Sequence, residues 1–232
     1  MSKQVVLEVQ RLFKSYYSSA DEIMILKEIN FKINTGEFVC IVGPSGSGKS
    51  TLLNIIGTLD KPTSGKILIN GEDVFSLNDY HLAFLRNKKI GFVFQSYNLI
   101  SRATILKNIE IPGIIFGLNK KERIERAYEI MTMLGIKDKA NYKPYNLSGG
   151  QQQRAAIARA LMTNPSIILA DEPTGNLDTK TGKEVFNLLK TLCYKYKTSI
   201  IMVTHNYDLA LQSDRIIYLK DGEIEKEEAL TK

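Results

Sequence analysis

The amino-acid sequence predicts an α/β fold that has a mostly parallel β-sheet, an N-terminal antiparallel β subdomain and an inserted helical subdomain. Apolar segments of strand length recur through the first third of the 232 residues. In the last third such segments alternate with helical spacing, which is typical of a parallel sheet with helices on its faces. Between about residues 104 and 162 the apolar residues recur at helical intervals instead, which predicts the helical insertion.

The first third contains most of the expected strands. An apolar run at residues 37–42 ends at a glycine-rich loop, and Asn70-Gly71 lies between apolar residues, as in a tight hairpin turn. The expected strands are residues 5–9, 25–33, 37–42, the two arms of the hairpin within 66–74, and 90–94.

The rest of the chain changes from helical to alternating patterns. The expected elements after the helical part are a strand at 167–170, a helix at 179–194, a strand at 199–204, a short helix after His205 and a strand at 215–219. We therefore expect a single domain, residues 1–232. Its core and β subdomain are residues 1–95 and 164–232, and its helical subdomain is residues 96–163.

Composition and charge exclude several classes of protein. The chain is 44% hydrophobic and 24% charged, which excludes disordered and collagen-like folds. Cys40 and Cys193 are too few for a disulfide framework and fit a reducing compartment. Although the net charge is +6, basic and acidic residues are interleaved, as at 120–126, so we expect no nucleic-acid partner.

The sequence predicts a cytoplasmic protein. No apolar run approaches the roughly 18 residues of a membrane span, and residues 1–14 lack the apolar core of a signal peptide. Any membrane role is expected to come through a partner.

Residues 43–50 match the complete G-x-x-x-x-G-K-[ST] pattern of a phosphate-binding loop, between an apolar strand and a helix-like segment. The glycines let backbone N–H groups turn toward phosphate oxygens, and the helix adds its positive N-terminal end. A lysine of this loop reaches the β- and γ-phosphates, and the hydroxyl of the next residue is a Mg²⁺ ligand. The pattern predicts a P-loop NTPase (RecA-like) core. The loop alone indicates a nucleoside triphosphate, and kinases, GTPases, helicases and transport ATPases all share it. The expected nucleotide-binding residues here are Gly43, Pro44, Ser45, Gly46, Ser47, Gly48, Lys49, Ser50 and Thr51.

Acidic and imidazole side chains follow two other apolar strands. Asp171 ends one strand and is placed to hold Mg²⁺, with a turn or helix cap as the alternative. Glu172 comes next and is expected to polarise the attacking water. His205 follows the second strand, at the sheet edge that holds the ligand. Two roles are open for His205: it either contacts the γ-phosphate or is a structural turn residue.

Leu147-Ser148-Gly149-Gly150-Gln151 precedes an alanine-rich helix. Ser148 suits an N-cap, and the glycines expose N–H groups at a second helix N-terminus, which is another potential anion site. Taken alone, this segment is better explained as a capped helix start.

The order of these segments resembles the ATP-binding cassette (ABC) family, over about residues 6–224. The loop at 43–50 is followed by Gln95 after a strand, by residues 147–151, by Asp171-Glu172, by Asp178 in Asn-Leu-Asp and by His205.

The resemblance implies a role for each matching residue. Tyr16 is the aromatic that stacks on adenine, with Tyr17 as the weaker choice, and Gln95 reaches Mg²⁺ and water. Glu172 is the catalytic base, Asp178 lies at a dimer interface, and His205 is the switch histidine. Ser148, Gly149, Gly150 and Gln151 form the signature motif, carried by the helical subdomain, which binds the γ-phosphate held by an opposite subunit. The implied catalytic residues are Glu172, His205 and Gln95; the implied metal ligands are Ser50, Gln95 and Asp171; the cofactors are ATP and Mg²⁺.

The resemblance further implies an ATPase that forms a head-to-tail homodimer on ATP and works with a membrane permease. Residues 53–65, 91–100 and 169–178 are similar to the macrolide-export and lipoprotein-release group (MacB/LolD type). The expected cargo class is antimicrobial peptide, macrolide or lipoprotein, and the expected location is the inner face of the cell membrane, through the permease. That permease is expected to dock near residues 96–116. The group often has Pro where Ser101 stands, so residues 101–112 either tune the choice of partner or have drifted neutrally.

Two other functions use the same motifs. A regulatory ATP clamp of the cell-division (FtsE) type signals to a membrane complex without transport. A DNA-repair or translation ATPase would need a long coiled coil or a second cassette, and neither fits 232 residues.

Overall fold

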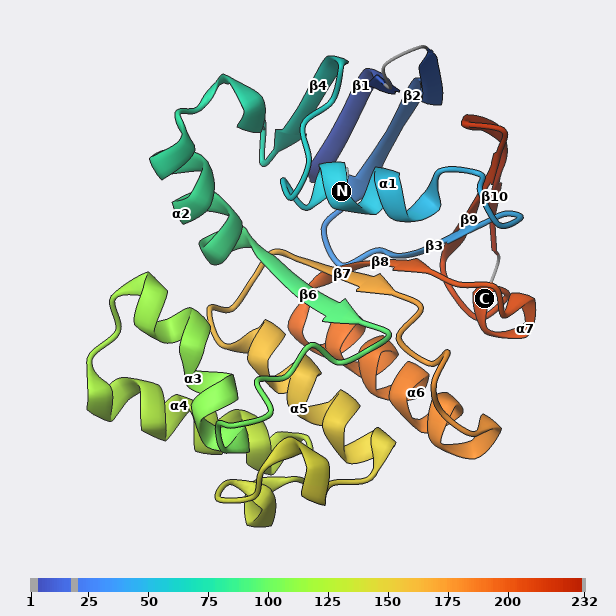
Figure 1. The fold of residues 1–232 in the computed structure, drawn as a ribbon. Helices are drawn as coiled ribbons and strands as arrows, with labels where there is room; N and C mark the ends of the chain where they lie inside the picture. The colour runs from blue at the N-terminus through green and yellow to red at the C-terminus, as the bar shows by residue number, and fades with distance from the viewer. Residues whose placement is uncertain (1–3, 18–20, 231–232) are drawn as a thin grey trace.

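The computed structural model describes residues 4–17 and 21–230. Two sheets and two layers of helices make up the molecule (Figure 1), and the order of the strands matches the expected α/β class. Within these residues, no helix has both the length and the apolar character needed to cross a bilayer.

The smaller sheet is antiparallel and has the order β2-β1-β4-β5. Its first two strands are longer than predicted, because β-bulges let β1 and β2 continue past the places where the alternation of apolar and polar residues fails. The predicted hairpin is confirmed, with Asn70 and Gly71 both at positive φ in the turn. Its strands are β1 (Val5–Tyr17), β2 (Glu22–Asn34), β4 (Ser64–Ile69) and β5 (Glu72–Asp73).

The larger sheet has the order β10-β9-β3-β8-β7-β6 and is parallel from β9 to β6. Its parallel strands lie where the sequence predicts them. The strand β10 was not predicted, because its charged residues lack an apolar run; it pairs antiparallel with β9 as a charged edge. The strands are β3 (Phe38–Val42), β6 (Ile90–Phe94), β7 (Ile167–Asp171), β8 (Ser199–Val203), β9 (Arg215–Lys220) and β10 (Glu223–Ala229).

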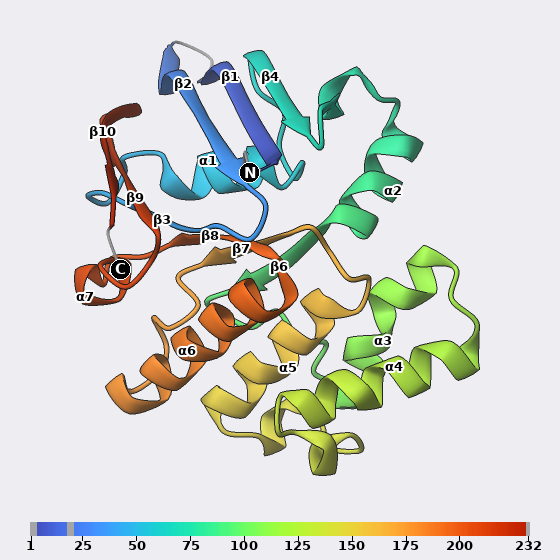
Figure 2. The same ribbon diagram turned by 180° about the vertical axis from the view of Figure 1, so that it is seen from behind.

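The helices cover both faces of the larger sheet. Helix α1 lies between the two sheets, whereas α5 and α6 pack on the opposite face of the larger sheet (Figures 1 and 2). Helix α2 was not predicted, since the first third of the chain was expected to form strands; its Asn78 cap and basic last turn stabilise it. The helices are α1 (Lys49–Ile56), α2 (Asp79–Lys89), α3 (Ile105–Phe116), α4 (Lys120–Met133), α5 (Gly149–Leu161), α6 (Thr179–Tyr196) and α7 (Tyr207–Ala210), with 3-10 turns η1 (Val74–Ser76), η2 (Lys137–Lys139) and η3 (Pro144–Asn146).

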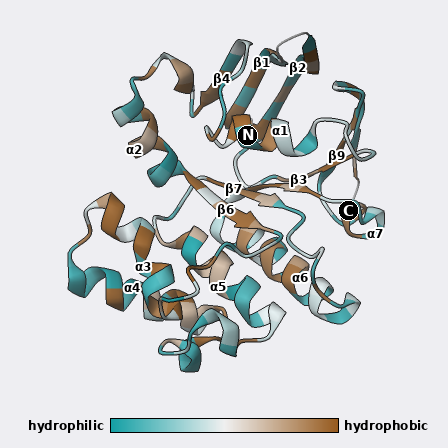
Figure 3. Cartoon of the chain, viewed as in Figure 1, coloured by the Kyte–Doolittle hydropathy of each residue, from teal (hydrophilic) through white to brown (hydrophobic). Residues whose placement is uncertain are grey.

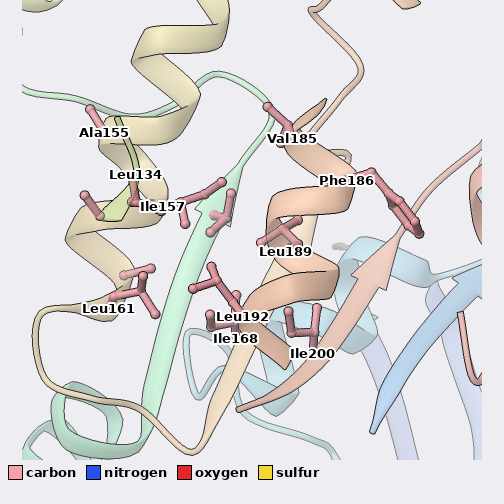
Figure 4. Close-up of a cluster of buried hydrophobic side chains, with 14 of the residues drawn as sticks. Leu134, Ala155, Ile157, Leu161, Ile168, Val185, Phe186, Leu189, Leu192 and Ile200 are labelled. Atoms are coloured by element: carbon pink, nitrogen blue, oxygen red, sulfur yellow. The ribbon is translucent and has the colours of Figure 1, made fainter. Parts of the chain in front are cut away.

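Two hydrophobic cores lie on the two faces of the larger sheet. Alternate residues of β3 divide between them: Val39 and Ile41 pack with α1 and the smaller sheet, and Phe38 and Cys40 pack on the helical side. Cys40 is fully buried. The central strands β3, β7 and β8 are therefore apolar on both faces (Figure 3), and α5 and α6 complete the second core through residues such as Ile157 and Phe186 (Figure 4).

Candidate functional site

The loop between β3 and α1 is shaped for an anion. Gly46 and Gly48 have φ values of 81° and 97°, a region that favours glycine. Gly48 is the N-cap of α1 and offers no side chain to the free N–H groups of the helix. The other α-helices of the described ranges all have side-chain caps, which are Asn78, Thr104, Asn119, Ser148, Asp178 and Asn206. The N-terminal N–H groups of α1 are thus left to an external acceptor, which fits a nucleotide phosphate.

Lys49 places a cation at the mouth of this loop. Its side chain is buried, and Nζ donates hydrogen bonds to the carbonyl oxygens of Gly43 at 2.9 Å and Pro44 at 2.7 Å. Burial lowers the pKa of Lys49, and the charges of Glu172 and Asp171 oppose that effect. The loop therefore holds the ammonium group in place before any phosphate arrives.

Asp171 and Ser50 form an oxygen-rich site at the end of β7. The Ser50 hydroxyl donates to Oδ1 of Asp171 at 3.3 Å. Burial raises the pKa of the Asp171 carboxyl, against the Ser50 hydrogen bond and the Lys49 and His205 charges. No group of three His, Cys, Asp or Glu residues able to hold a metal occurs in the described part of the chain. The Ser50 hydroxyl, the Asp171 carboxylate and the Gln95 side-chain amide instead fit Mg²⁺, which keeps water and phosphate oxygens among its ligands.

Glu172 and His205 face each other beside this oxygen pair. Nε2 of His205 lies 3.2 Å from Oε1 of Glu172, and the His205 backbone N–H donates to Oε2 at 3.4 Å. Glu172 has a left-handed φ of 46°, held by its backbone hydrogen bond to Val203 in β8. Burial raises the pKa of Glu172, and the charge of His205 acts against it. A carboxyl group with a raised pKa is suited to accept a proton near neutral pH.

Gln95 is held at the loop that follows Glu172. Its Nε2 donates to Oδ1 of Asn176 at 3.2 Å, and Nδ2 of Asn176 donates to the Gln95 carbonyl at 3.1 Å. A Cβ on Gly175 would lie 2.6 Å from Nε2 of Gln95, so glycine is needed for this contact. The strand β6 is thereby connected to the loop that follows the acidic pair, Asp171 and Glu172.

These residues share one hollow of about 460 Å³. It brings together the phosphate loop, the acidic pair, Gln95 and His205, which the sequence predicted at separate positions. The lining residues are Ile25, Ser45, Gly46, Gly48, Lys49, Ser50, Thr51, Gln95, Asp171, Glu172, Val203 and His205.

Other predicted site residues do not line this hollow. The Ser148 hydroxyl accepts from the Gln151 N–H at 3.4 Å while the Gln151 side chain accepts from the Ser148 N–H at 3.1 Å, so this pair caps α5. Asp178 caps α6 by accepting from the N–H groups of Lys180 and Thr181, and the side-chain and backbone hydrogen bonds with Thr181 lower its pKa. Tyr16 is 45% exposed at the end of β1.

Sequence reasoning missed Gln153, which is fully buried in α5. Its Nε2 donates to the Pro173 carbonyl at 2.6 Å and lies 3.5 Å from the Phe94 carbonyl. It therefore joins α5 to the residue after Glu172 and to the strand that leads to Gln95. The available signal was its place in the i, i+4, i+8 series with Ile157 and Leu161, where a polar residue falls on the apolar face of a helix.

Comparisons with known proteins agree with this geometry. The family model described as ABC transporter matches residues 26–175. An uncharacterized ABC transporter ATP-binding protein of Thermotoga maritima is 50% identical over 95% of this chain and 94% of its own. The macrolide export ATP-binding/permease protein MacB of Vibrio parahaemolyticus is 48% identical over 95% of this chain, which spans only 34% of that protein.

Solved structures extend the agreement to the fold. The dimeric structure of the ABC transporter cassette MJ0796, a protein of Methanocaldococcus jannaschii, has a TM-score of 0.89 at 49% identity and covers 97% of this chain and 99% of its own. A second structure of that cassette, in a post-hydrolysis state bound to ADP and Pi, has the same TM-score, identity and coverage. The expected resemblance to the macrolide-export group is confirmed, and the chain belongs to the ABC transporter family as one of its ATP-binding, ATP-hydrolysing proteins.

Proposed function

We propose that this chain is the ATP-hydrolysing subunit of an export-type transporter, which pairs head to tail with a second copy on binding ATP and drives a membrane permease. The observation that carries the proposal is the hollow in which the uncapped start of α1, Lys49, Asp171, Glu172 and His205 converge. Each group there has a place in the hydrolysis of a nucleoside triphosphate.

The residues of the hollow divide the chemistry between them. Lys49 and the N-terminal N–H groups of α1 bind the β- and γ-phosphates, and the proposed Mg²⁺ ligands are Ser50, Asp171 and Gln95. Mg²⁺, when bound, neutralises charge on the phosphate oxygens. Glu172 takes a proton from water as the water oxygen attacks the γ-phosphorus and the bond to ADP breaks. His205 orients Glu172 and contacts the γ-phosphate.

The signature segment supports the head-to-tail pairing. Ser148, Gly149, Gly150 and Gln151 are absent from the lining of the hollow, so the same chain does not bring them to its own phosphate loop. The Ser148–Gln151 capping box satisfies two N–H groups at the start of α5, and the proposed contacts for a phosphate from the other copy are the Ser148 hydroxyl and the N–H groups of Gly149 and Gly150. In the proposed pair each copy supplies this segment to the nucleotide of the other copy, and Asp178 lies at the interface. The MJ0796 cassette is dimeric in its solved structure, which supports a pairing of two copies.

A groove on the helical side is the proposed docking site of the permease. It has a volume of about 460 Å³ and lies between α2, β6, α3 and α5. Its lining includes Asn98 and Pro112, within the expected docking region, and extends to Ala83 of α2, which the sequence did not predict. Ile115 is 65% exposed at its edge and supplies an apolar contact for a helix of the partner.

The similarity to the macrolide export protein MacB supports an export permease. The proposed cargo is of the macrolide, antimicrobial-peptide or lipoprotein class. The proposed location is the cytoplasmic face of the cell membrane, where the permease would hold the chain. No nucleic-acid partner is proposed, because basic and acidic residues alternate in the chain.

The test measures the oligomeric state of Glu172→Gln with and without ATP. Phosphate release by this variant is compared with phosphate release by the unchanged protein. The substitution removes the base and keeps the shape of the side chain. ATP is expected to convert Glu172→Gln from monomer to dimer, while turnover falls by about 10²-fold or more. Glu125→Gln is the matched control, since Glu125 makes only an exposed ion pair with Lys121, and it should retain normal turnover.

Unchanged turnover in Glu172→Gln would refute the role of Glu172. A monomer that persists with ATP, even after reconstitution with the permease, would refute the head-to-tail pairing. For the groove, Ile115→Asp is expected to abolish stimulation of ATPase activity by the permease while the activity of the isolated chain is retained. Retained stimulation would place the docking surface elsewhere.

A further inference from the structure

A buried cation lies beside Tyr16. Lys14 is only 8% exposed, and its Nζ lies 4.5 Å from the centroid of the Tyr16 ring, over one face of it. The same Nζ donates to Oδ1 of Asp60 at 2.8 Å and to the Lys61 carbonyl at 2.7 Å. Lys14 is thus held by three partners and does not move freely in solvent.

Asp60 connects the ring to the same cation. The Tyr16 hydroxyl donates to Oδ2 of Asp60 at 2.7 Å, so the two carboxylate oxygens bind the two side chains separately. The carboxylate also accepts from the Lys61 N–H at 2.7 Å. Despite burial, the hydrogen bonds from Lys14 and Tyr16 lower the pKa of Asp60. The ring is therefore fixed at its hydroxyl end by Asp60 and on one face by Lys14.

The same segment is tied to the phosphate loop through α1. Asp60 follows the end of α1, where the N–H groups of Leu59 and Asp60 both bond to the carbonyl of Asn54, within the helix. The strand β1 is joined to this segment again, because the Ser15 N–H donates to Oγ1 of Thr63 at 2.9 Å. Helix α1 begins with the phosphate loop, so it sets the distance between that loop and the Tyr16 ring.

We propose that Asp60 and Lys14 are positioning residues, which hold the Tyr16 ring as a platform for the nucleotide base at a set distance from the phosphate loop. This inference rests on the proposed function, in which Tyr16 stacks on adenine. With Lys14 over one face and Asp60 at the hydroxyl, the ring keeps one free face and one orientation for the base. A fixed ring loses less conformational entropy on stacking than a mobile one.

The experiment compares a ligand that has a base with one that has none. Dissociation constants for ADP and for inorganic pyrophosphate, each with Mg²⁺, are measured by calorimetry on the full chain. Asp60→Asn is expected to weaken ADP binding by about fivefold to tenfold, the loss typical of one ordinary hydrogen bond, and to leave pyrophosphate binding unchanged. The matched control is Asp79→Asn, because Asp79 is an exposed carboxylate that pairs with Lys61 at 3.5 Å; it should change neither constant.

Two variants of Tyr16 make the outcomes distinct. Tyr16→Ala is expected to weaken ADP binding at least as much as Asp60→Asn, whereas Tyr16→Phe keeps the ring and loses the hydroxyl group that bonds to Asp60. In the Tyr16→Phe background, Asp60→Asn should therefore cause a smaller loss than it does alone. Thermal unfolding midpoints are measured to check that each variant is folded at the temperature of the binding measurement. If Asp60→Asn does not fold, Tyr16→Phe tests the contact between Tyr16 and Asp60 from the other side.

The results separate this inference from the proposed function. Normal ADP binding in Asp60→Asn together with weakened binding in Tyr16→Ala would overturn the positioning role and leave the adenine platform intact. Normal binding in Tyr16→Ala would refute the platform itself. Equal losses for ADP and pyrophosphate in Asp60→Asn would show that Asp60 acts on the phosphate loop through α1, which also overturns the proposal.

Discussion

Replacing Gln153 by Met is expected to slow ATP hydrolysis, although Gln153 does not line the nucleotide hollow. The substitution keeps the length of the side chain and removes the 2.6 Å hydrogen bond to the Pro173 carbonyl. Because Pro173 directly follows Glu172, the loop that positions the base loses its connection to α5. A displacement of about 1 Å at a reacting group can cost on the order of 10²-fold in rate, so we expect turnover to fall by about tenfold or more.

The cost in stability is expected to be modest. Leaving the buried Pro173 carbonyl without its donor costs about 1–3 kcal/mol. The change also removes Oε1 of Gln153, which is buried without a hydrogen-bond partner, and this offsets part of the loss. A net loss of about 1–2 kcal/mol in the free energy of unfolding corresponds to a fall of about 2–8 °C in Tm for a chain of this size.

The assays are phosphate release at saturating ATP and urea unfolding followed by circular dichroism. Gln10→Met is the matched control, since the Gln10 side chain donates its hydrogen bond to Glu8 within β1, and it should leave turnover unchanged. Normal turnover in Gln153→Met would refute the positioning argument, and a loss of stability greater than about 4 kcal/mol would show that Gln153 acts mainly in the core.

Three further outcomes are expected. The acid limb of the kcat/KM profile should lie at higher pH than that of an ordinary glutamate, because burial raises the pKa of Glu172 and its ionised form is the base. In His205→Gln, which loses the charge that opposes this effect, the residual activity should show the acid limb at still higher pH. An unmoved limb would contradict the pairing of His205 with Glu172. Gly91→Ala should lower the free energy of unfolding by about 1–3 kcal/mol in urea, because its Cβ would lie 2.7 Å from the Ala160 carbonyl oxygen of α5. An unchanged unfolding midpoint would mean that α5 can shift away from β6 without cost. Phe186→Ala, at a side chain 1% exposed, should cost about 3–5 kcal/mol by the same measurement, and a cost under 1 kcal/mol would show that the second core refills the cavity.

Residues close together along the chain could be assigned from sequence. The loop at 43–50 carries its own backbone requirements, because glycines at positive φ and a following helix are local features. The parallel strands were predicted because both of their faces are apolar, and Asn70-Gly71 determined a turn by its own conformational preference. Helix α2 and strand β10 were missed, since neither has a strong apolar pattern and each depends on its caps or on its partner strand.

What the sequence by itself determined was therefore the class of fold, the family and the identity of the residues around the phosphate loop. Tertiary structure alone decided which of these residues meet. It placed Gln95, Glu172 and His205 in one hollow and kept Ser148 out of it, and it joined Gln153 to Pro173 and Lys14 to Asp60 and Tyr16. Apart from the local contact between Lys14 and Tyr16, these contacts join residues 20 to more than 100 positions apart, and their energies depend on burial and on distances that no local pattern contains.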